Sequence, residues 1–296
     1  MLSLLPFPST LPGAEMRIAA ALVFTAIAAY FDAFNKKWVP NYVVYCFLAT
    51  AFVLNLVYFE AETFKLALGS AAVIFAISFA LYKLGQLGGA DAYVLTAISL
   101  SVPYLPQPIL SAAQQPPYPF ILSVLAPTGF AFILHMLLRF IPYISKKISH
   151  GQVKFGISKL FGPALLTAAF AVFLSVMLSF PVALPQFYLG ILSFLFLALI
   201  FFSLFKDEIK ASMVEMVPTG KLQAEDVLAL EQMDASLVKK FRLSALISEK
   251  TIAALRKSKL KKVPVYTGMP FFLPYLFFGL LVTILFGDVL SLLLIP

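Results

Sequence analysis

The stretch LPQFYLGILSFLFLALIFFSLF, residues 184–205, contains no charged side chain and is long enough to cross a bilayer as one helix. Seven further apolar runs are spaced along the chain. With 61% hydrophobic and 12% charged residues and a mean hydropathy of +0.95, a water-soluble fold is excluded. The other runs are residues 17–32, 40–59, 64–82, 91–102, 120–138, 160–180 and 269–294.

These runs predict an all-α polytopic membrane protein with about eight transmembrane helices. The run at 91–102 is short, and we count it because Pro103, Pro106 and Pro108 can lie in a non-helical segment that completes the crossing. Residues 1–205 would hold the first seven helices, 206–265 a small cytoplasmic helical domain, and 266–296 the last helix.

Basic residues test this topology independently, because cytoplasmic loops are enriched in Lys and Arg. Alternating eight crossings leaves only Arg17 and Lys65 of the 22 basic residues on one side. The multi-pass protein is therefore expected in the cell membrane with both termini outside. The net charge of +8 is a topology signal and does not indicate a nucleic-acid partner.

Within the basic segment 206–265, helices are expected at 224–233 and 248–260 from the spacing of apolar residues, with Ser248 as the N-cap of the second. Four lysines precede the last apolar run and favour contact with anionic membrane lipid. They are Lys257, Lys259, Lys261 and Lys262.

Cysteine and histidine are too few for a common metal site. Cys46 has no second cysteine to pair with, and His135 and His150 do not form an HExxH pattern. We therefore expect no metal and no cofactor. Nothing in the sequence predicts an oligomeric state.

Three of the 14 acidic residues, Asp32, Asp91 and Asp288, interrupt or border apolar runs, where a carboxylate is costly. The predicted topology places Asp32 and Asp91 at the cytoplasmic face and Asp288 at the other. Two close carboxyl groups share a proton, which is the chemistry of an aspartic protease. The alternative is that Asp32 pairs with Lys36 and Asp91 with Lys83.

Small and helix-starting residues surround the two aspartates. Gly85, Gly88 and Gly89 leave the backbone before Asp91 bare, so that an extended substrate strand can approach it, or they merely break the helix. After Asp32, Pro40 and Asn41 are typical of a helix start.

Together these residues resemble the GxGD-type aspartic membrane peptidases, and within them the archaeal type IV prepilin and preflagellin (prearchaellin) peptidases. The matching strings are Ala29-Tyr30-Phe31-Asp32, Val39-Pro40-Asn41 and Gly88-Gly89-Ala90-Asp91, in which Ala90 replaces the second Gly of the strict motif. Residues 263–270 and the string GMPFFLP also resemble the C-terminal part of archaeal members. Residues 103–205 depart from the family's usual layout by two extra helices.

The resemblance implies an endopeptidase with Asp32 and Asp91 as the catalytic pair. Gly88, Gly89, Ala90, Pro40 and Asn41 would form the motifs around the substrate. Its partners would be the class III signal peptides of prepilins or prearchaellins, cleaved at the cytoplasmic membrane face. Bacterial relatives that also methylate carry a cysteine-rich loop, which is absent here, so the chain looks like a peptidase only.

Two alternatives remain. Presenilin and signal-peptide-peptidase relatives also combine two aspartates with a later PAL string, which Pro163-Ala164-Leu165 supplies here. The other alternative is a cation- or proton-coupled transporter in which the two aspartates bind the ion.

Overall fold

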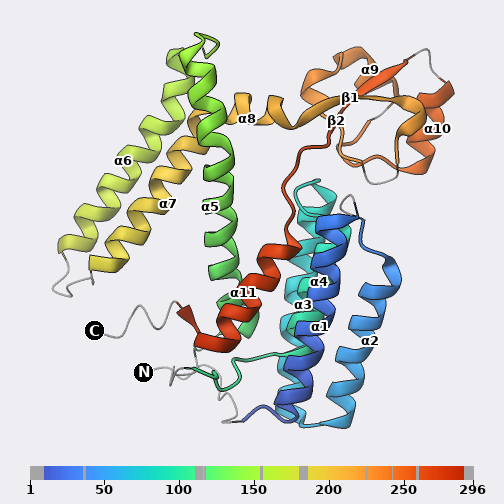
Figure 1. Ribbon diagram of the computed structural model, residues 1–296, viewed down its shortest axis with the longest axis vertical. Coiled ribbons are helices and arrows are strands. Elements are labelled where there is room, and N and C mark those ends of the chain that lie inside the picture. The colour runs from blue at the N-terminus through green and yellow to red at the C-terminus, as the bar shows by residue number, and fades with distance from the viewer. Residues whose placement is uncertain are drawn as a thin grey trace. The chain divides into compact units, whose positions relative to one another are not determined.

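The computed structural model describes residues 10–35, 38–110, 116, 118–153, 156–179, 186–223, 226–241, 243–257 and 260–289 (Figure 1). The chain forms two compact units. The first comprises Met1–Phe132, Met216–Val265 and Pro270–Leu292, and the second comprises Ile133–Glu215, Tyr266–Met269 and Leu293–Pro296.

A bundle of five helices and the first part of a sixth dominates the first unit. In it, α1 packs against α2, α4 and α11, and α4 also packs against α2 and α3. Their bounds are α1 Ala14–Phe34, α2 Asn41–Val57, α3 Ala61–Lys83, α4 Gly89–Ser101 and α11 Leu273–Phe286, and α5, Phe120–Ser149, enters the unit with its N-terminal part.

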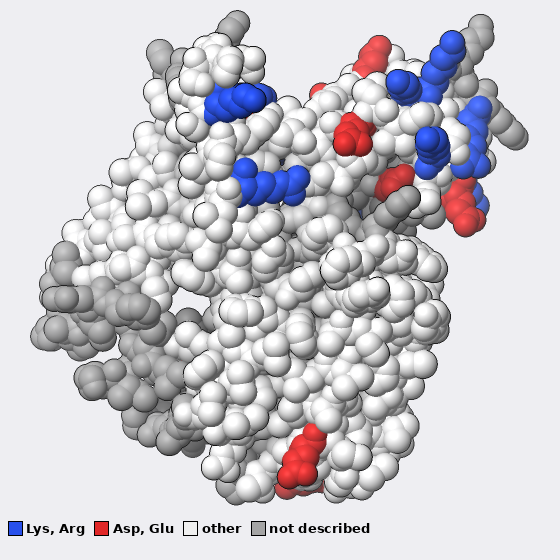
Figure 2. Space-filling view, viewed as in Figure 1, with Lys and Arg blue, Asp and Glu red and all other residues white. Residues whose placement is uncertain are grey.

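Helix α1 shows why these apolar segments form a membrane bundle. Its buried side chains are mostly small, among them Ala21 and Ala28, and recur at helical spacing. Large apolar side chains such as Val23, Ile27 and Tyr30 are exposed instead. Small residues inside and large apolar residues outside are typical of helices that pack closely together within lipid. Figure 2 shows how sparse charged side chains are over the helices.

The contact of α11 with α5 depends on one glycine. A Cβ added at Gly279 would overlap Oγ1 of Thr128 and would lie 2.7 Å from the backbone oxygen of Val124. The hydroxyl of Thr283, one turn further on, donates to the backbone oxygen of Ser123 at 3.2 Å. The two helices therefore approach each other at backbone distance.

Residues 216–265, called the small subdomain below, contain short elements around their own apolar core of residues such as Leu228, Ile247 and Leu255. The two strands form one sheet. The elements are β1 Val214–Pro218, η1 Thr219–Lys221, η2 Leu230–Gln232, α9 Ala235–Phe241, α10 Glu249–Lys257 and β2 Lys262–Tyr266.

The prediction of a helix at 224–233 is wrong over the described residues 226–233. Because the subdomain contains two strands, the chain is mostly helical and not all-α. Val227 and Leu228 form β-bridges with Leu246 and Val265, so this apolar run is extended except at η2. The second prediction is confirmed: α10 follows Ser248, whose Oγ accepts the N–H of Thr251 at 3.4 Å.

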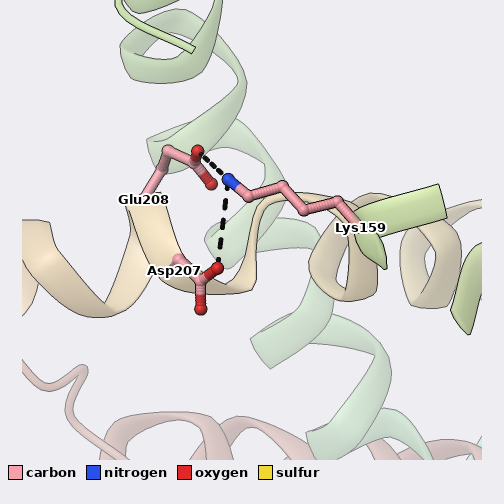
Figure 3. A network of polar contacts seen from close by, with 3 residues as sticks. All are labelled: Lys159, Asp207 and Glu208. Carbon is pink, nitrogen blue, oxygen red and sulfur yellow. Dashed lines mark hydrogen bonds and ion pairs between the residues drawn. The ribbon is translucent and has the colours of Figure 1, made fainter. Parts of the chain in front are cut away.

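The second unit contains the rest of α5 together with α6 (Ile157–Ser179), α7 (Gln186–Leu204) and α8 (Lys206–Met213). Helices α6 and α7 pack together, and the rings of Phe170 and Phe196 stack with centroids 3.9 Å apart. Lys159 of α6 donates to Glu208 of α8 at 2.6 Å and lies 3.9 Å from Asp207 (Figure 3).

Four described helical segments are long and apolar enough to cross a membrane: Ala14–Phe34, Ala61–Lys83, Phe120–Ser149 and Lys159–Val176. A bent pair, Leu189–Leu204 with Lys206–Met213 at 71°, makes a fifth if it counts as one span. Helices α2 and α11 are apolar but shorter. The total of eight crossings stays a prediction.

Candidate active site

Asp32 lies in the last turn of α1, and its side chain is buried. Its Oδ2 accepts two backbone hydrogen bonds, from the N–H of Phe272 and the N–H of Leu273, each at 3.1 Å. These two groups begin α11. The first N–H groups of a helix have no partner within it, and the carboxylate of Asp32 supplies one.

Asp91 lies in the first turn of α4 and caps its own helix. Its Oδ2 accepts the N–H of Gly88 at 3.0 Å. Gly89 and Ala90 complete the turn between them. A Cβ added at Gly88 would lie 2.9 Å from Oδ2 of Asp91, so the lack of a side chain there leaves room for the carboxyl group.

The fold brings these two carboxyl groups together at one end of the bundle. Helix α1 ends and α4 begins there, and the two helices pack against each other. The groups are close enough for the charge of Asp32 to act on Asp91. Phe31, Ala90 and Phe272 all pack against the same hydrophobic cluster. Residues 59 positions apart in sequence thus form one acidic pair.

The alternative ion pairs find little support. Among the described residues, no lysine or arginine lies within ion-pair distance of Asp91. The ammonium group of Lys83 lies over the rings of Phe79 and Tyr82 instead, at 5.0 and 5.4 Å from their centroids. The predicted partner of Asp32, Lys36, falls outside the described residues.

Comparison with known proteins gives a match that includes both aspartates. Residues 19–142 match the sequence model of the type IV leader peptidase family. The match covers 124 of the 296 residues and supports a protease of the prepilin-peptidase type. No curated protein and no solved structure matches the chain.

The other predicted motif residues begin a helix. Pro40 is the N-cap of α2 and is buried, whereas Asn41 is its first residue and is exposed. The chain following α1 thus re-enters the bundle at Pro40. Whether Pro40 and Asn41 take part in substrate binding stays a prediction.

The turn before Asp91 packs against the small subdomain. Gly85 has a φ of +71°, a backbone conformation that residues with a Cβ rarely adopt. The position of its missing Cβ is 3.5 Å from Val227 and 3.6 Å from Ala245. The subdomain therefore supports the turn that leads to Asp91.

Sequence reasoning did not find the role of the α11 N-terminus. Pro274 occupies the first turn of α11, a usual place for proline, and so marks a helix start at this point. The string GMPFFLP, which contains Pro274, resembles the family but does not indicate a contact with Asp32. No local pattern indicates that the N–H groups of Phe272 and Leu273 meet Asp32, which is 241 residues from Leu273.

Within the described part of the chain, no group of three or more His, Cys, Asp or Glu side chains is arranged to hold a metal ion. Cys46 lies on the exposed face of α2. The site that the described residues present is a pair of carboxyl groups held by backbone N–H donors.

Proposed function

We propose that the chain is an aspartic endopeptidase that cleaves the class III signal peptides of prepilins or prearchaellins. Asp32 and Asp91 are its catalytic pair. The observation that carries the proposal is the approach of these two carboxyl groups within the segment that matches type IV leader peptidases.

The proposed chemistry uses one ionised and one protonated carboxyl group. The ionised group takes a proton from water as the water oxygen attacks the carbonyl carbon of the scissile peptide bond. The protonated group donates to the carbonyl oxygen and stabilises the charge that forms on it. Collapse of the tetrahedral intermediate breaks the C–N bond, and a carboxyl group returns a proton to the leaving amine. Both carboxyl groups are then ready for another cycle.

The bare backbone at Gly88 and Gly89 gives a substrate strand access to this pair. Gly88 is exposed. An extended peptide can lie against such a segment without meeting a side chain and can hydrogen-bond to the main chain. This would place the scissile bond of the leader next to Asp91.

The proposed topology is eight crossings with both termini outside and the catalytic pair at the cytoplasmic face. The distribution of Lys and Arg supports it. A class III leader has its basic segment on the same side, just before its hydrophobic helix. The resemblance to archaeal members, together with a single cysteine, favours a peptidase without methyltransferase activity.

The test is cleavage of labelled prepilin or prearchaellin by the purified protein in detergent or liposomes. Asp32→Asn and Asp91→Asn should each abolish cleavage while the protein stays folded. Asp207→Asn is the matched control, because it makes the same chemical change at a side chain that is 73% exposed and belongs to the other unit. It should cleave at the wild-type rate.

The same assay separates the alternatives. Cleavage of a generic membrane helix but not of a leader peptide would favour a presenilin-like protease. The string Pro163-Ala164-Leu165 of this chain lies in α6, and Pro163 is inside the helix. Ion uptake by liposomes without any cleavage would favour a transporter.

A further inference from the structure

The two carboxyl groups of the proposed catalytic pair have unequal surroundings. Asp32 accepts two N–H groups from the start of α11, a segment distant in sequence. Asp91 accepts one, from Gly88 in its own turn. Geometry alone thus distinguishes two residues that the sequence treats alike.

The hydrogen-bond donors around Asp32 favour the ionised form of its carboxyl group. Two N–H groups point at one oxygen, and they belong to a helix N-terminus, which carries a partial positive charge. Asp32 as a residue is only 6% exposed, so water contributes little to stabilising its charge. An ionised carboxylate accepts both hydrogen bonds without losing an acceptor to a proton.

Asp91 lies where a second negative charge is unfavourable. The charge of Asp32 acts on it, and among the described residues no cation lies within ion-pair distance. Two close carboxyl groups in a partly buried site do not both ionise. The proton of the pair therefore belongs on the partner with fewer donors.

We propose that the first turn of α11 is a positioning element that keeps Asp32 as the ionised, water-activating partner and leaves Asp91 as the partner that carries the proton. The N–H groups of Phe272 and Leu273 act through Asp32 and do not touch substrate. This inference rests on the proposed function for the roles of the two residues, but the location of the proton is measurable without substrate.

Infrared difference spectra of the purified protein, recorded as the pH is raised, test the location of the proton. A protonated carboxyl group has a C=O band that an ionised one lacks. Asp91→Asn leaves Asp32 with its two N–H donors, and Asp32→Asn leaves Asp91 with one. The band of the remaining carboxyl group should therefore disappear at a lower pH in Asp91→Asn than in Asp32→Asn. Equal pH values in the two variants or the reverse order overturn the assignment.

Two substitutions at Leu273 test the positioning role. Leu273→Pro removes the N–H at the first residue of α11, whereas Leu273→Ala removes side-chain packing but keeps the N–H. The proline variant should have a kcat about tenfold below that of the alanine variant. Its activity should also begin to fall at a higher pH on the acid side, because Asp32 with one donor fewer is harder to ionise.

If the two Leu273 variants have equal kcat values and lose activity at the same acidic pH, the positioning role is contradicted. If Leu273→Pro does not fold, the infrared comparison decides the inference, since it needs neither Leu273 variant. Failure of the wild-type protein to cleave any leader would refute the proposed function and leave the infrared result to be judged separately.

Discussion

Arg17 donates a hydrogen bond from Nη1 to Oδ1 of Asn55 at 3.0 Å, inside the bundle and at the end of α1 remote from Asp32. Both side chains are buried. Arg17 also donates to the backbone oxygen of Ser101 at 2.9 Å, and Asn55 donates to that of Leu100 at 2.7 Å. This network joins α1, α2 and α4, the helices that carry and flank the proposed catalytic pair.

Asn55→Ala should therefore lower the free energy of unfolding by about 1–3 kcal/mol, because buried donors and acceptors lose their partners. Thermal unfolding in detergent would show this as a lower midpoint. Asn35→Ala is the control, since Asn35 also hydrogen-bonds to a backbone oxygen but is exposed, and its midpoint should stay close to that of wild type. Equal midpoints for the two variants would contradict a stabilising role of the buried network.

Gly88→Ala should reduce activity with little loss of stability. The φ of −71° at Gly88 suits any residue, so the backbone accepts alanine. The new methyl group would lie 2.9 Å from Oδ2 of Asp91 and would displace the carboxyl group. We expect kcat to fall about ten- to hundredfold in the leader-cleavage assay, since small displacements of catalytic groups have effects of this size.

The matched control for Gly88 is Gly69→Ala in α3, where nothing lies within 4 Å of the added carbon. Its kcat should equal that of wild type. A Gly88→Ala enzyme as active as the Gly69 variant would show that the position of the Asp91 carboxyl group does not limit the reaction.

Gly279→Ala should separate α11 from α5. The added carbon would overlap Thr128 and the backbone oxygen of Val124, and a backbone does not yield as a side chain does. We expect a loss of about 1–3 kcal/mol in unfolding free energy. Gly129→Ala, in open space on α5, should be neutral or slightly stabilising because alanine favours helix. A destabilised Gly129 variant would show that α5 is destabilised by an added methyl group even where that group meets no neighbour.

The contact between α8 and α6 should weaken in acid. Burial raises the pKa of Glu208, but the hydrogen bond from Lys159 and the positive charges of Lys159 and Lys147 outweigh it, so this pKa lies below its ordinary value of 4.5. A lowered pKa contributes stability that is complete above the ordinary value and lost as the pH falls below it.

The unfolding midpoint of Glu208→Gln should accordingly be lower than that of wild type at pH 7, and the difference should shrink towards about pH 4. Asp207→Asn should show little difference at either pH, because Asp207 is exposed and 3.9 Å from Lys159. A Glu208→Gln difference that is independent of pH would contradict the role of the charge.

The proposed catalytic pair could be predicted because acidic side chains are rare in apolar runs. That rarity singles out Asp32, Asp91 and Asp288, and only the predicted topology, which puts Asp32 and Asp91 on one side and Asp288 on the other, separates the pair from Asp288. The small subdomain was harder, because short apolar stretches such as 226–233 suit a helix and a strand equally. The pairing of Val227 with Leu246 and of Leu228 with Val265 depends on the tertiary fold.

Arg17 illustrates a second limit of prediction from sequence. Counting basic residues by side treats a charge at the edge of an apolar run as part of a loop, and Arg17 entered the count in this way. The structure corrects this: Arg17 is a buried residue of α1 that is held by carbonyl and amide oxygens. Lys65, exposed and paired with Glu62, lies at the surface as expected.

The hydrogen bonds from α11 to Asp32 have a consequence for the order in which the protein becomes active. A ribosome that has made residues 1–260 has already supplied both aspartates and the segment that matches the family. The donors at Phe272 and Leu273 do not yet exist. The proposed site is therefore completed only after the start of α11 has been made, so that a nascent or truncated chain that stops before Phe272 lacks both donors to Asp32.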